Sequence, residues 1–432
     1  MSELNIESIG TVRNRFATLD KEQKLAAKIK VIGVGGGGGN AIDYMIAKGL
    51  KGVEYIAINT DAQVLDKNLA EQKVNIGKNL TKGLGAGADP NVGRKAVEED
   101  REKISKLLEG SDMVFVTAGM GGGTGTGAAP IVASIAKSLG SLVIAIVTKP
   151  FNWEGKTRMK NATEGIQELR QYVDSLIVIP NERILNILDD NSPIADAFDK
   201  PNEVLYEATR GISEIITVRG KINVDFADVR SSMNQSGIAL MGCGVATGAN
   251  RAIEAATKAI TSPLLEGIDI KGAKHILINV TGSTNLSYKE VINANQTIQE
   301  RAGGEANIIF GIVYKEDMNE SISYTVIATG FSKPENQSAS KGILSEVTGA
   351  KTENPVTQIK KGWGFKLDEN EDKNIPTIAR IQNRTANEND ENSFQSGFNY
   401  RGSITPEKEN NIQNKTNNND NESSTFLRMM MD

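Results

Sequence analysis

Short apolar runs alternate with segments whose apolar residues recur at helical spacing, through most of the chain before residue 333. The runs VEYIAINT, DMVFVTAG, LVIAIVTK and SLIVIP are rich in β-branched residues, which is typical of buried strands. Strands that alternate with helices in this way form a parallel sheet with helices on both faces. The pattern therefore predicts a doubly wound α/β domain over residues 28–200.

The next part of the chain predicts a second, smaller domain. Residues 201–218 carry apolar side chains at helical spacing, which predicts a long helix between two domains. Four further strand-like runs follow, with one or two helices between them: GIALMGCGVATG, KHILINVTG, NIIFGIVYKED and SISYTVIATG. We therefore expect a central helix over residues 201–220 and an α+β domain over residues 221–331.

Both ends of the chain differ from this pattern. Asn, Lys, Glu and Ser dominate after residue 333, and such a segment buries too little apolar surface to offset its ordering entropy. We expect a disordered linker over residues 332–424, and the apolar tip TFLRMMMD at residues 425–432 fits a partner-binding peptide, with a frayed terminus as the alternative. Residues 1–27 form an N-terminal extension that lacks the apolar core of a signal peptide.

Composition narrows the function classes. The net charge of −5 and the pI of about 5.4 provide no basic field for nucleic acid, so we expect no nucleic-acid partner. Cys243 is the single cysteine and His275 the single histidine, which excludes a disulfide framework, a Ser-His-Asp or Cys-His site and a multi-histidine metal site. Both residues lie in strand-like runs; Cys243 is expected to be buried, and His275 is expected in the core or at a strand edge. We expect a cytoplasmic protein without direct membrane insertion.

The stretch VIGVGGGGGNAI, residues 31–42, places five consecutive glycines between a strand-like run and a helical pattern. Glycine permits positive φ and lets a ligand approach backbone amides without a Cβ in between. At a strand–loop–helix junction, the helix N-terminus favours an anion such as phosphate. The alternative is a tight turn without a ligand, because a G-x-G-x-x-G match alone is a weak signal.

A second glycine cluster, AGMGGGTGTGAAP at residues 118–130, again follows a strand-like run and precedes a helical pattern. Such loops gather at the carboxyl ends of parallel strands, so we expect the two clusters to meet at one crevice. Thr124 and Thr126 add hydroxyl donors, which suits several phosphate oxygens. The glycine-rich loop LGAGADP at residues 84–90 is expected to be a third loop around a triphosphate.

The loops leave several nucleotide-binding classes open. A P-loop is excluded, because no stretch of the chain supplies G-x-x-x-x-G-K-[ST]. A dinucleotide-dependent oxidoreductase explains the first loop, with Asn59 or Asp61 near the position that holds the ribose, but leaves GGGTGTG unexplained. This class stays an alternative, together with a nucleotide-binding regulator that does not turn over.

Four motifs, GVGGGGGNA, GGGTGTGAAP, PFNWEGKTR and NVDFADV, resemble in their order and spacing the tubulin/FtsZ superfamily, and within it the bacterial cell-division GTPases. The resemblance covers about residues 28–331 and extends to the linker and the terminal peptide. It implies a GTP-binding domain, a long central helix and a smaller activation domain, which matches the division predicted above.

The resemblance also implies nucleotide contacts. Glu154 and Arg158 match ribose and phosphate contacts, and Asn181 and Asn202 match guanine contacts. GTP is then the substrate and GDP the product, and Mg²⁺ is expected to be held mainly by the nucleotide phosphates and water. The contacts implied in the glycine loops come from Gly36, Gly37, Gly38, Gly39 and Asn40, and from Gly123, Thr124 and Gly125.

The segment KINVDFADVR suggests the chemistry. Asp225 and Asp228 share a face in a helical turn, while Val224, Phe226 and Val229 are expected to anchor the segment. Carboxylates repel a triphosphate unless water or Mg²⁺ lies between them, yet hydrolysis needs polar groups that orient water. The alternative is a solvated acidic turn.

The resemblance implies a division of labour between subunits. One subunit binds GTP, and the loop of the next subunit, here Asn223, Asp225 and Asp228, completes the site over the γ-phosphate, so hydrolysis requires polymerisation. Head-to-tail contacts are heterologous and propagate into open filaments. The resemblance further implies that the terminal peptide binds membrane-anchoring and regulatory division proteins, and that the filaments form a ring at mid-cell on the inner membrane face.

Overall fold

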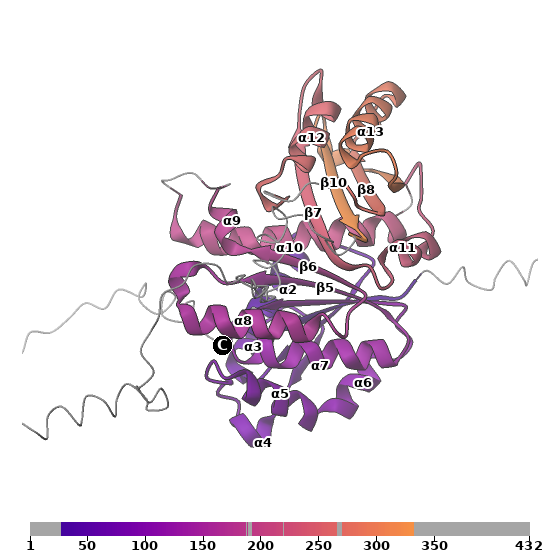
Figure 1. The fold of residues 1–432 in the computed structure, drawn as a ribbon. Helices are drawn as coiled ribbons and strands as arrows, with labels where there is room; N and C mark the ends of the chain where they lie inside the picture. Colours follow the sequence, from indigo (N-terminus) through magenta and orange to yellow (C-terminus); the bar gives the residue numbers. More distant parts are fainter. Residues whose placement is uncertain (1–26, 187, 189–191, 219, 266–269, 332–432) are drawn as a thin grey trace, which may run out of the picture. The chain divides into compact units, whose positions relative to one another are not determined.

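The computed structural model, drawn in Figure 1, describes residues 27–186, 188, 192–218, 220–265 and 270–331. The predicted linker 332–424, the predicted peptide 425–432 and all but the last residue of the predicted extension 1–27 lie outside the described residues. Within the described part, strands and helices alternate as the apolar pattern predicts.

Six parallel strands form the first part of the sheet, in the order β3-β2-β1-β4-β5-β6. Most of these strands are apolar on both faces because helices cover both faces; the edge strand β3 is the exception. In β1, Ile29 and Val31 join one core, whereas Ile32 and Val34 join the other. The strands are β1 (Ile29–Val34), β2 (Glu54–Asn59), β3 (Gln72–Asn75), β4 (Met113–Gly119), β5 (Leu142–Lys149) and β6 (Ser175–Pro180).

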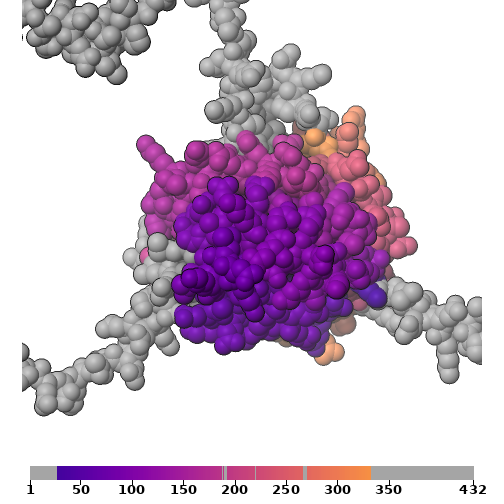
Figure 2. All heavy atoms as spheres, turned by 90° about the horizontal axis from the view of Figure 1, so that it is seen from below, coloured from indigo at the N-terminus to yellow at the C-terminus, as the bar shows by residue number. Residues whose placement is uncertain are grey.

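Helices cover this sheet on two sides, which confirms the predicted doubly wound fold. One core holds side chains of α2 (Gly35–Ala47) and α10 (Ile194–Thr217). The other core holds side chains of four helices that lie together in the lower half of Figure 1: α5 (Pro90–Glu99), α6 (Arg101–Leu108), α7 (Thr124–Ser138) and α8 (Lys156–Leu169). The surface seen from below belongs largely to this first part of the chain, drawn in indigo to purple (Figure 2). Shorter helices are α3 (Ala62–Lys67), α4 (Lys78–Thr81) and α9 (Asn181–Leu185).

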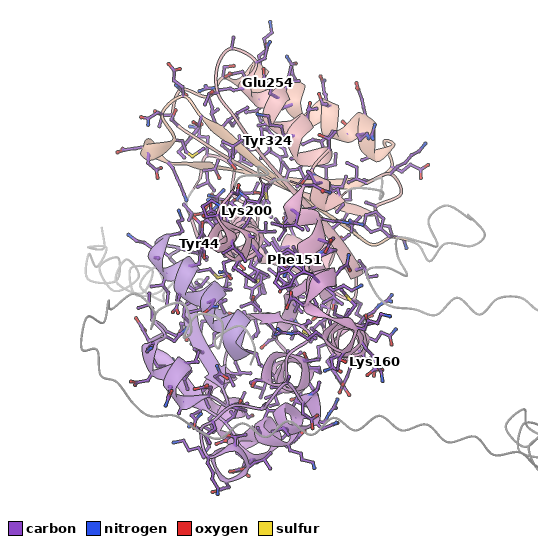
Figure 3. The ribbon with its side chains drawn as sticks, turned by 90° about the vertical axis from the view of Figure 1, so that its left-hand side faces the viewer. Tyr44, Phe151, Lys160, Lys200, Glu254 and Tyr324 are labelled. Atoms are coloured by element: carbon purple, nitrogen blue, oxygen red, sulfur yellow. The ribbon has the colours of Figure 1, made fainter. Side chains whose placement is uncertain are left out.

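The second part of the sheet confirms the predicted smaller α+β region. Strand β7 pairs parallel with β6 and antiparallel with β10, and the order continues as β7-β10-β8-β9. Helices α12 and α13 pack on one face and form a core in which Tyr324, labelled in Figure 3, is fully buried. The elements are α11 (Phe226–Met233), β7 (Gly237–Ala246), α12 (Arg251–Ile260), β8 (His275–Gly282), α13 (Tyr288–Ala302), β9 (Asn307–Tyr314) and β10 (Ile322–Thr329).

Helix α10 begins earlier than predicted. It begins at Ile194, whereas the helical spacing of apolar residues predicts a start at residue 201. Pro201 lies inside the helix and is buried. The turn before it is held by Phe198, whose ring contacts Phe151 edge-on at 6.0 Å. The helix therefore begins before the apolar pattern that predicts it, in a turn that packs against Phe151.

Candidate functional site

The two glycine clusters meet at the carboxyl ends of β1 and β4, which confirms their predicted convergence. A Cβ on Gly35 would lie 2.8 Å from the backbone nitrogen of Gly125, and one on Gly37 would lie 3.1 Å from the Cα of Gly119. Side chains at these positions would separate the loops. The glycines therefore allow two helix N-termini to approach the same space.

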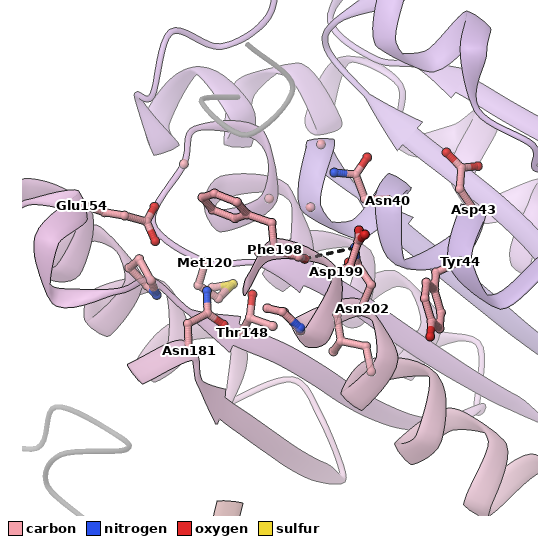
Figure 4. A pocket seen from close by; sticks show the side chains of 18 of the residues that line it. Asn40, Asp43, Tyr44, Met120, Thr148, Glu154, Asn181, Phe198, Asp199 and Asn202 are labelled. Carbon is pink, nitrogen blue, oxygen red and sulfur yellow. Dashed lines mark hydrogen bonds between the residues drawn. The ribbon is translucent and has the colours of Figure 1, made fainter. Parts of the chain in front are cut away.

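A cavity of about 410 Å³ lies where the loops meet. It is formed at the carboxyl ends of β1, β4, β5 and β6, with α10 along one side, and Figure 4 shows the side chains around it. The predicted nucleotide contacts that line the cavity are Gly36, Gly37, Asn40, Gly125, Glu154, Arg158, Asn181 and Asn202.

The other predicted contacts lie behind the cavity wall. The Thr124 hydroxyl lies 2.6 Å from that of Thr60, and the Thr126 hydroxyl accepts a hydrogen bond from the Gly121 amide at 2.8 Å. These hydroxyls fix the loop from inside. Gly38, Gly39 and Gly123 are buried close to neighbouring backbone or side chains and do not line the cavity.

The loop of residues 84–90 lies against the second glycine cluster and not along the cavity. Its Ala86 and Asp89 pack against Gly123, where an added Cβ would lie 2.7 Å from the Ala86 Cβ. Among the described residues that line the cavity, none belongs to this loop. The loop therefore packs against the second glycine cluster from behind, and its place around a triphosphate stays a prediction.

The cavity attracts anions at its glycine end. Helices α2 and α7 begin there, and the N-cap residues Val34 and Gly123 provide no side-chain cap. The first amides of such helices and the helix dipoles favour a phosphate. The guanidinium of Arg158 lines the same cavity, 3.2 Å from a carboxylate oxygen of Glu154. A second Glu154 oxygen accepts from the Phe151 amide at 2.7 Å, which orients this pair.

The other end of the cavity combines amide side chains with an aromatic ring. Asn181 is buried, with 6% of its surface exposed, and its Oδ1 has no hydrogen-bond partner among the described residues. A buried acceptor without a donor is costly, and a ligand N–H would remove that cost. Asn202 donates through Nδ2 to the Phe198 carbonyl at 3.4 Å, the contact dashed in Figure 4. The Phe198 ring forms an apolar side of this end, and it contacts the Phe151 ring, which does not itself line the cavity.

One face of α2 adds lining residues that the sequence analysis missed. Asp43, Tyr44 and Ala47 line the cavity beside Asn40, at helical spacing on one face of the helix. Burial raises the pKa of the Asp43 carboxyl, against the opposing effect of a hydrogen bond from the Leu69 amide. The spacing from Asn40 was a usable signal, but the sequence does not say which face of α2 turns towards the ligand.

The predicted catalytic residues lie on the surface at α11. Asn223 accepts from the Gly220 amide at 2.6 Å, and Asp225 caps α11 by accepting from the Ala227 amide at 3.3 Å. Asp225 and Asp228 are exposed. Val224 and Val229 are buried, with 7% and 0% of their surface exposed, and Phe226 packs against the same core, so the predicted anchoring is confirmed.

The structure places this acidic loop and the cavity at opposite ends of the parallel strands. Asp225 shares a surface groove with Lys28, Gly110 and Asp112, which precede β1 and β4. The cavity lies at the carboxyl ends of the same strands. A six-residue strand such as β1 spans about 20 Å. One chain therefore does not bring the acidic residues to its own cavity.

The residues that would bind the ribose in the oxidoreductase alternative do not line the cavity. Asp61 caps α3 by accepting from the amides of Gln63 and Val64, at 2.8 and 3.1 Å. The Asn59 side chain accepts from the Asp61 amide at 3.2 Å. Neither residue lines the cavity. Both are thus committed to the β2–α3 turn.

The described residues also bear on the Cys243 thiol, on metal ligands and on membrane-spanning helices. Burial raises the pKa of the Cys243 thiol to about 12, which suits a core position and not a nucleophile. Across residues 27–331, apart from the short gaps named above, no trio of His, Cys, Asp or Glu side chains is placed to ligate a metal. No helix in that part of the chain combines the length and apolar character needed to cross a bilayer.

The fold and the cavity define a GTPase of the tubulin type. Residues 28–189 match the model of the Tubulin/FtsZ family GTPase domain, and residues 237–332 match that of the FtsZ family C-terminal domain. A structure of an empty FtsZ dimer from M. jannaschii is 44% identical, covers 76% of this chain and 93% of its own, and superimposes with a TM-score of 0.69. The chain belongs to the FtsZ family and is a cytoskeletal GTPase.

More distant structures share the fold. A GTPγS-bound protofilament of CetZ2 from Haloferax volcanii is 22% identical, with a TM-score of 0.62, and covers 75% of this chain and 100% of its own. A GDP-bound CetZ1 monomer from the same organism is 23% identical, with a TM-score of 0.63, and covers 74% and 99%. Family membership implies self-association of this chain.

Proposed function

We propose that the chain hydrolyses GTP within head-to-tail filaments, in which the acidic loop of one subunit completes the nucleotide cavity of the next. The observation that carries this proposal is the placement of the cavity and the acidic loop at opposite ends of the parallel strands. Stacking copies end to end brings the two surfaces together. The contact is heterologous, so each added copy presents a new open end.

In this proposal the cavity binds GTP along its length. The α2 and α7 N-termini bind the phosphates through the lining residues Gly36, Gly37, Asn40 and Gly125, with Arg158 adding charge and Glu154 contacting the ribose. Gly38, Gly39, Gly123 and Thr124 lie behind this lining and hold the two loops in place. Asn181 and Asn202 bind guanine, and the unpartnered Asn181 Oδ1 supports this assignment because it needs a donor. The related CetZ2 protofilament was captured with GTPγS.

Mg²⁺ fits the proposal as a companion of the substrate. The described residues offer no cluster of ligands for it, so the nucleotide phosphates and water hold it. Bound there, Mg²⁺ would neutralise phosphate charge during hydrolysis. Asn223, Asp225 and Asp228 would orient the attacking water from the neighbouring subunit, and their exposure leaves them accessible to it.

Turnover by the purified protein is expected to depend on concentration. Below an assembly threshold, GTP binds but phosphate release per subunit is near zero, because the acids of a second copy are missing. Above the threshold, specific activity rises and sedimentation with GTP but not GDP recovers the protein. Phosphate release and sedimentation measured across the same dilutions check this. Turnover strictly proportional to protein at every dilution contradicts the proposal.

We also propose a cytoplasmic filament at mid-cell, attached by residues 425–432 to membrane-bound division proteins. The apolar cluster of Phe426, Leu427 and three methionines, with Arg428 beside it, is enough to fill a groove on such a partner. Deleting residues 425–432 is expected to leave GTP hydrolysis and sedimentation unchanged and to abolish the mid-cell ring, seen by fluorescence microscopy. Loss of assembly by the purified truncated protein would make the tail part of the filament.

A further inference from the structure

A buried carboxylate lies at the amino end of the sheet, far from the nucleotide cavity. Asp174, directly before β6, has a side chain that is 1% exposed. Its Oδ2 accepts from the Val143 amide at 2.9 Å, and its Oδ1 accepts from the Gln235 amide at 3.3 Å and from the Lys137 ammonium. A carboxylate is this deeply buried only where charge and hydrogen bonds compensate its desolvation. Its position is therefore tightly determined.

Asp174 holds the end of the helix that carries the acidic loop. Gln235 follows α11 and has a φ of +52°, a conformation that residues other than glycine seldom adopt. The hydrogen bond to Asp174 fixes the chain at this turn. Lys137 lies in the last turn of α7, so the carboxylate joins the end of α11 to the end of α7 and to β5.

Two further contacts act on the same helix. Arg230 donates to the Gly140 carbonyl, just beyond α7, at 3.2 Å, and Thr329 of β10 donates to the Ser232 carbonyl at 2.9 Å. Helix α11 has eight residues and is about 12 Å long. Asp225 and Asp228 stand at its first turn and Asp174 holds its far end. A tilt at one end therefore moves the other.

We propose that Asp174 is a positioning residue for GTP hydrolysis by the neighbouring subunit's cavity, acting through α11. This inference rests on the proposed function. Asp174 lies in the subunit that contributes Asp225 and Asp228 to the shared site. Its substitution therefore affects hydrolysis of the nucleotide bound by the neighbouring subunit. Its own cavity, at the other end of the strands, is left intact. Misplacing a catalytic group by about 1 Å can cost up to about 100-fold in rate.

The test uses the full-length Asp174→Asn protein, because the amide keeps the size of the carboxylate while removing the charge that pairs with Lys137. We expect kcat in assembled protein to fall about 10- to 100-fold. GTP affinity of the dilute protein, KM, and sedimentation with GTPγS are expected to stay within about twofold. A purely structural role would instead change affinity or assembly together with kcat, and that result overturns the inference.

A second pair of variants covers the case in which Asp174→Asn does not fold. Lys137→Met leaves the two amide hydrogen bonds of Asp174 in place and is expected to lower kcat several-fold, whereas Lys137→Arg restores it. Glu290→Gln is the matched control, because Glu290 is likewise a carboxylate paired with a basic side chain, Arg251 at 3.2 Å, but in α13. It is expected to lower the melting temperature without lowering kcat. Wild-type kcat in Lys137→Met overturns the inference.

Asp228→Ala separates this inference from the function on which it rests. If Asp174→Asn keeps the wild-type kcat while Asp228→Ala loses activity, the positioning role is wrong and the proposed function stands. If Asp228→Ala also keeps the wild-type kcat, the proposed function itself fails. In equimolar mixtures, wild-type subunits are expected to restore hydrolysis at Asp228→Ala cavities, whereas Asp174→Asn subunits restore at least tenfold less.

Discussion

Asp228→Ala is expected to lower GTP turnover by assembled protein at least about 100-fold, the usual contribution of a group that assists proton transfer to or from the attacking water. GTP affinity is expected to change less than about twofold, because Asp228 lies on α11 and does not line the nucleotide cavity. Phosphate release above the assembly threshold and calorimetric titration of dilute protein with GTP measure the two quantities.

Asp225 needs a different substitution, because its side chain also caps α11. Asp225→Ala removes both the charge and the cap, at a cost of about 1 kcal/mol of helix stability. Asp225→Asn removes the charge and keeps a capping oxygen, so it is the control that isolates the chemistry. We expect it to lose turnover while its melting temperature stays close to that of the wild type. Wild-type turnover in both Asp225→Asn and Asp228→Ala would contradict catalysis by the acidic loop.

Gly125→Val is expected to abolish GTP binding, with an affinity loss of at least about 100-fold, equivalent to about 2.7 kcal/mol. A Cβ at this position would lie 2.7 Å from the Gly119 carbonyl oxygen and 3.3 Å from that of Val34. Both obstacles are backbone atoms, so no side chain can move aside, and the two glycine loops must separate. Calorimetric titration with GTP and Mg²⁺ measures the loss.

The control for Gly125→Val is Gly49→Asn, just beyond the end of α2. Gly49 has a φ of +70° and no atom within 4 Å of an added Cβ, and asparagine tolerates this conformation better than other residues. Gly49→Asn is expected to bind GTP as the wild type does. If Gly125→Val binds GTP with unchanged affinity while folded, the assignment of the phosphates to these loops is wrong.

Most of the fold could be predicted because its strands are buried on both faces. Runs such as DMVFVTAG and LVIAIVTK are apolar throughout, so each strand is visible without knowing its neighbours. Strand β3 was missed, since its sequence QKVN is short and polar at the edge of the sheet. The early start of α10 was missed because the apolar spacing that predicts the helix begins at residue 201, whereas the contact of Phe198 with Phe151 is tertiary.

The candidate site could be predicted in part. Glycine clusters that follow strands predict where a ligand can contact backbone amides, and the cavity lies at these clusters. The sequence does not tell which residues of a loop line the cavity. Thr124 and residues 84–90 lie behind the lining residues, and their contact with a nucleotide stays a prediction. The distance between the acidic loop and the cavity follows from strand direction, a tertiary property. The family resemblance agrees with this separation, because it implies that the acidic loop completes the site of a neighbouring subunit.

The separation of cavity and acidic loop gives a filament two chemically different tips. In the proposed arrangement, a row of n copies holds n − 1 completed sites, with one uncovered cavity at one tip and one unused acidic loop at the other. Turnover per copy then scales as (n − 1)/n, so a dimer works at about half the rate of a long row. In this arrangement, specific activity reports the mean length of the filaments.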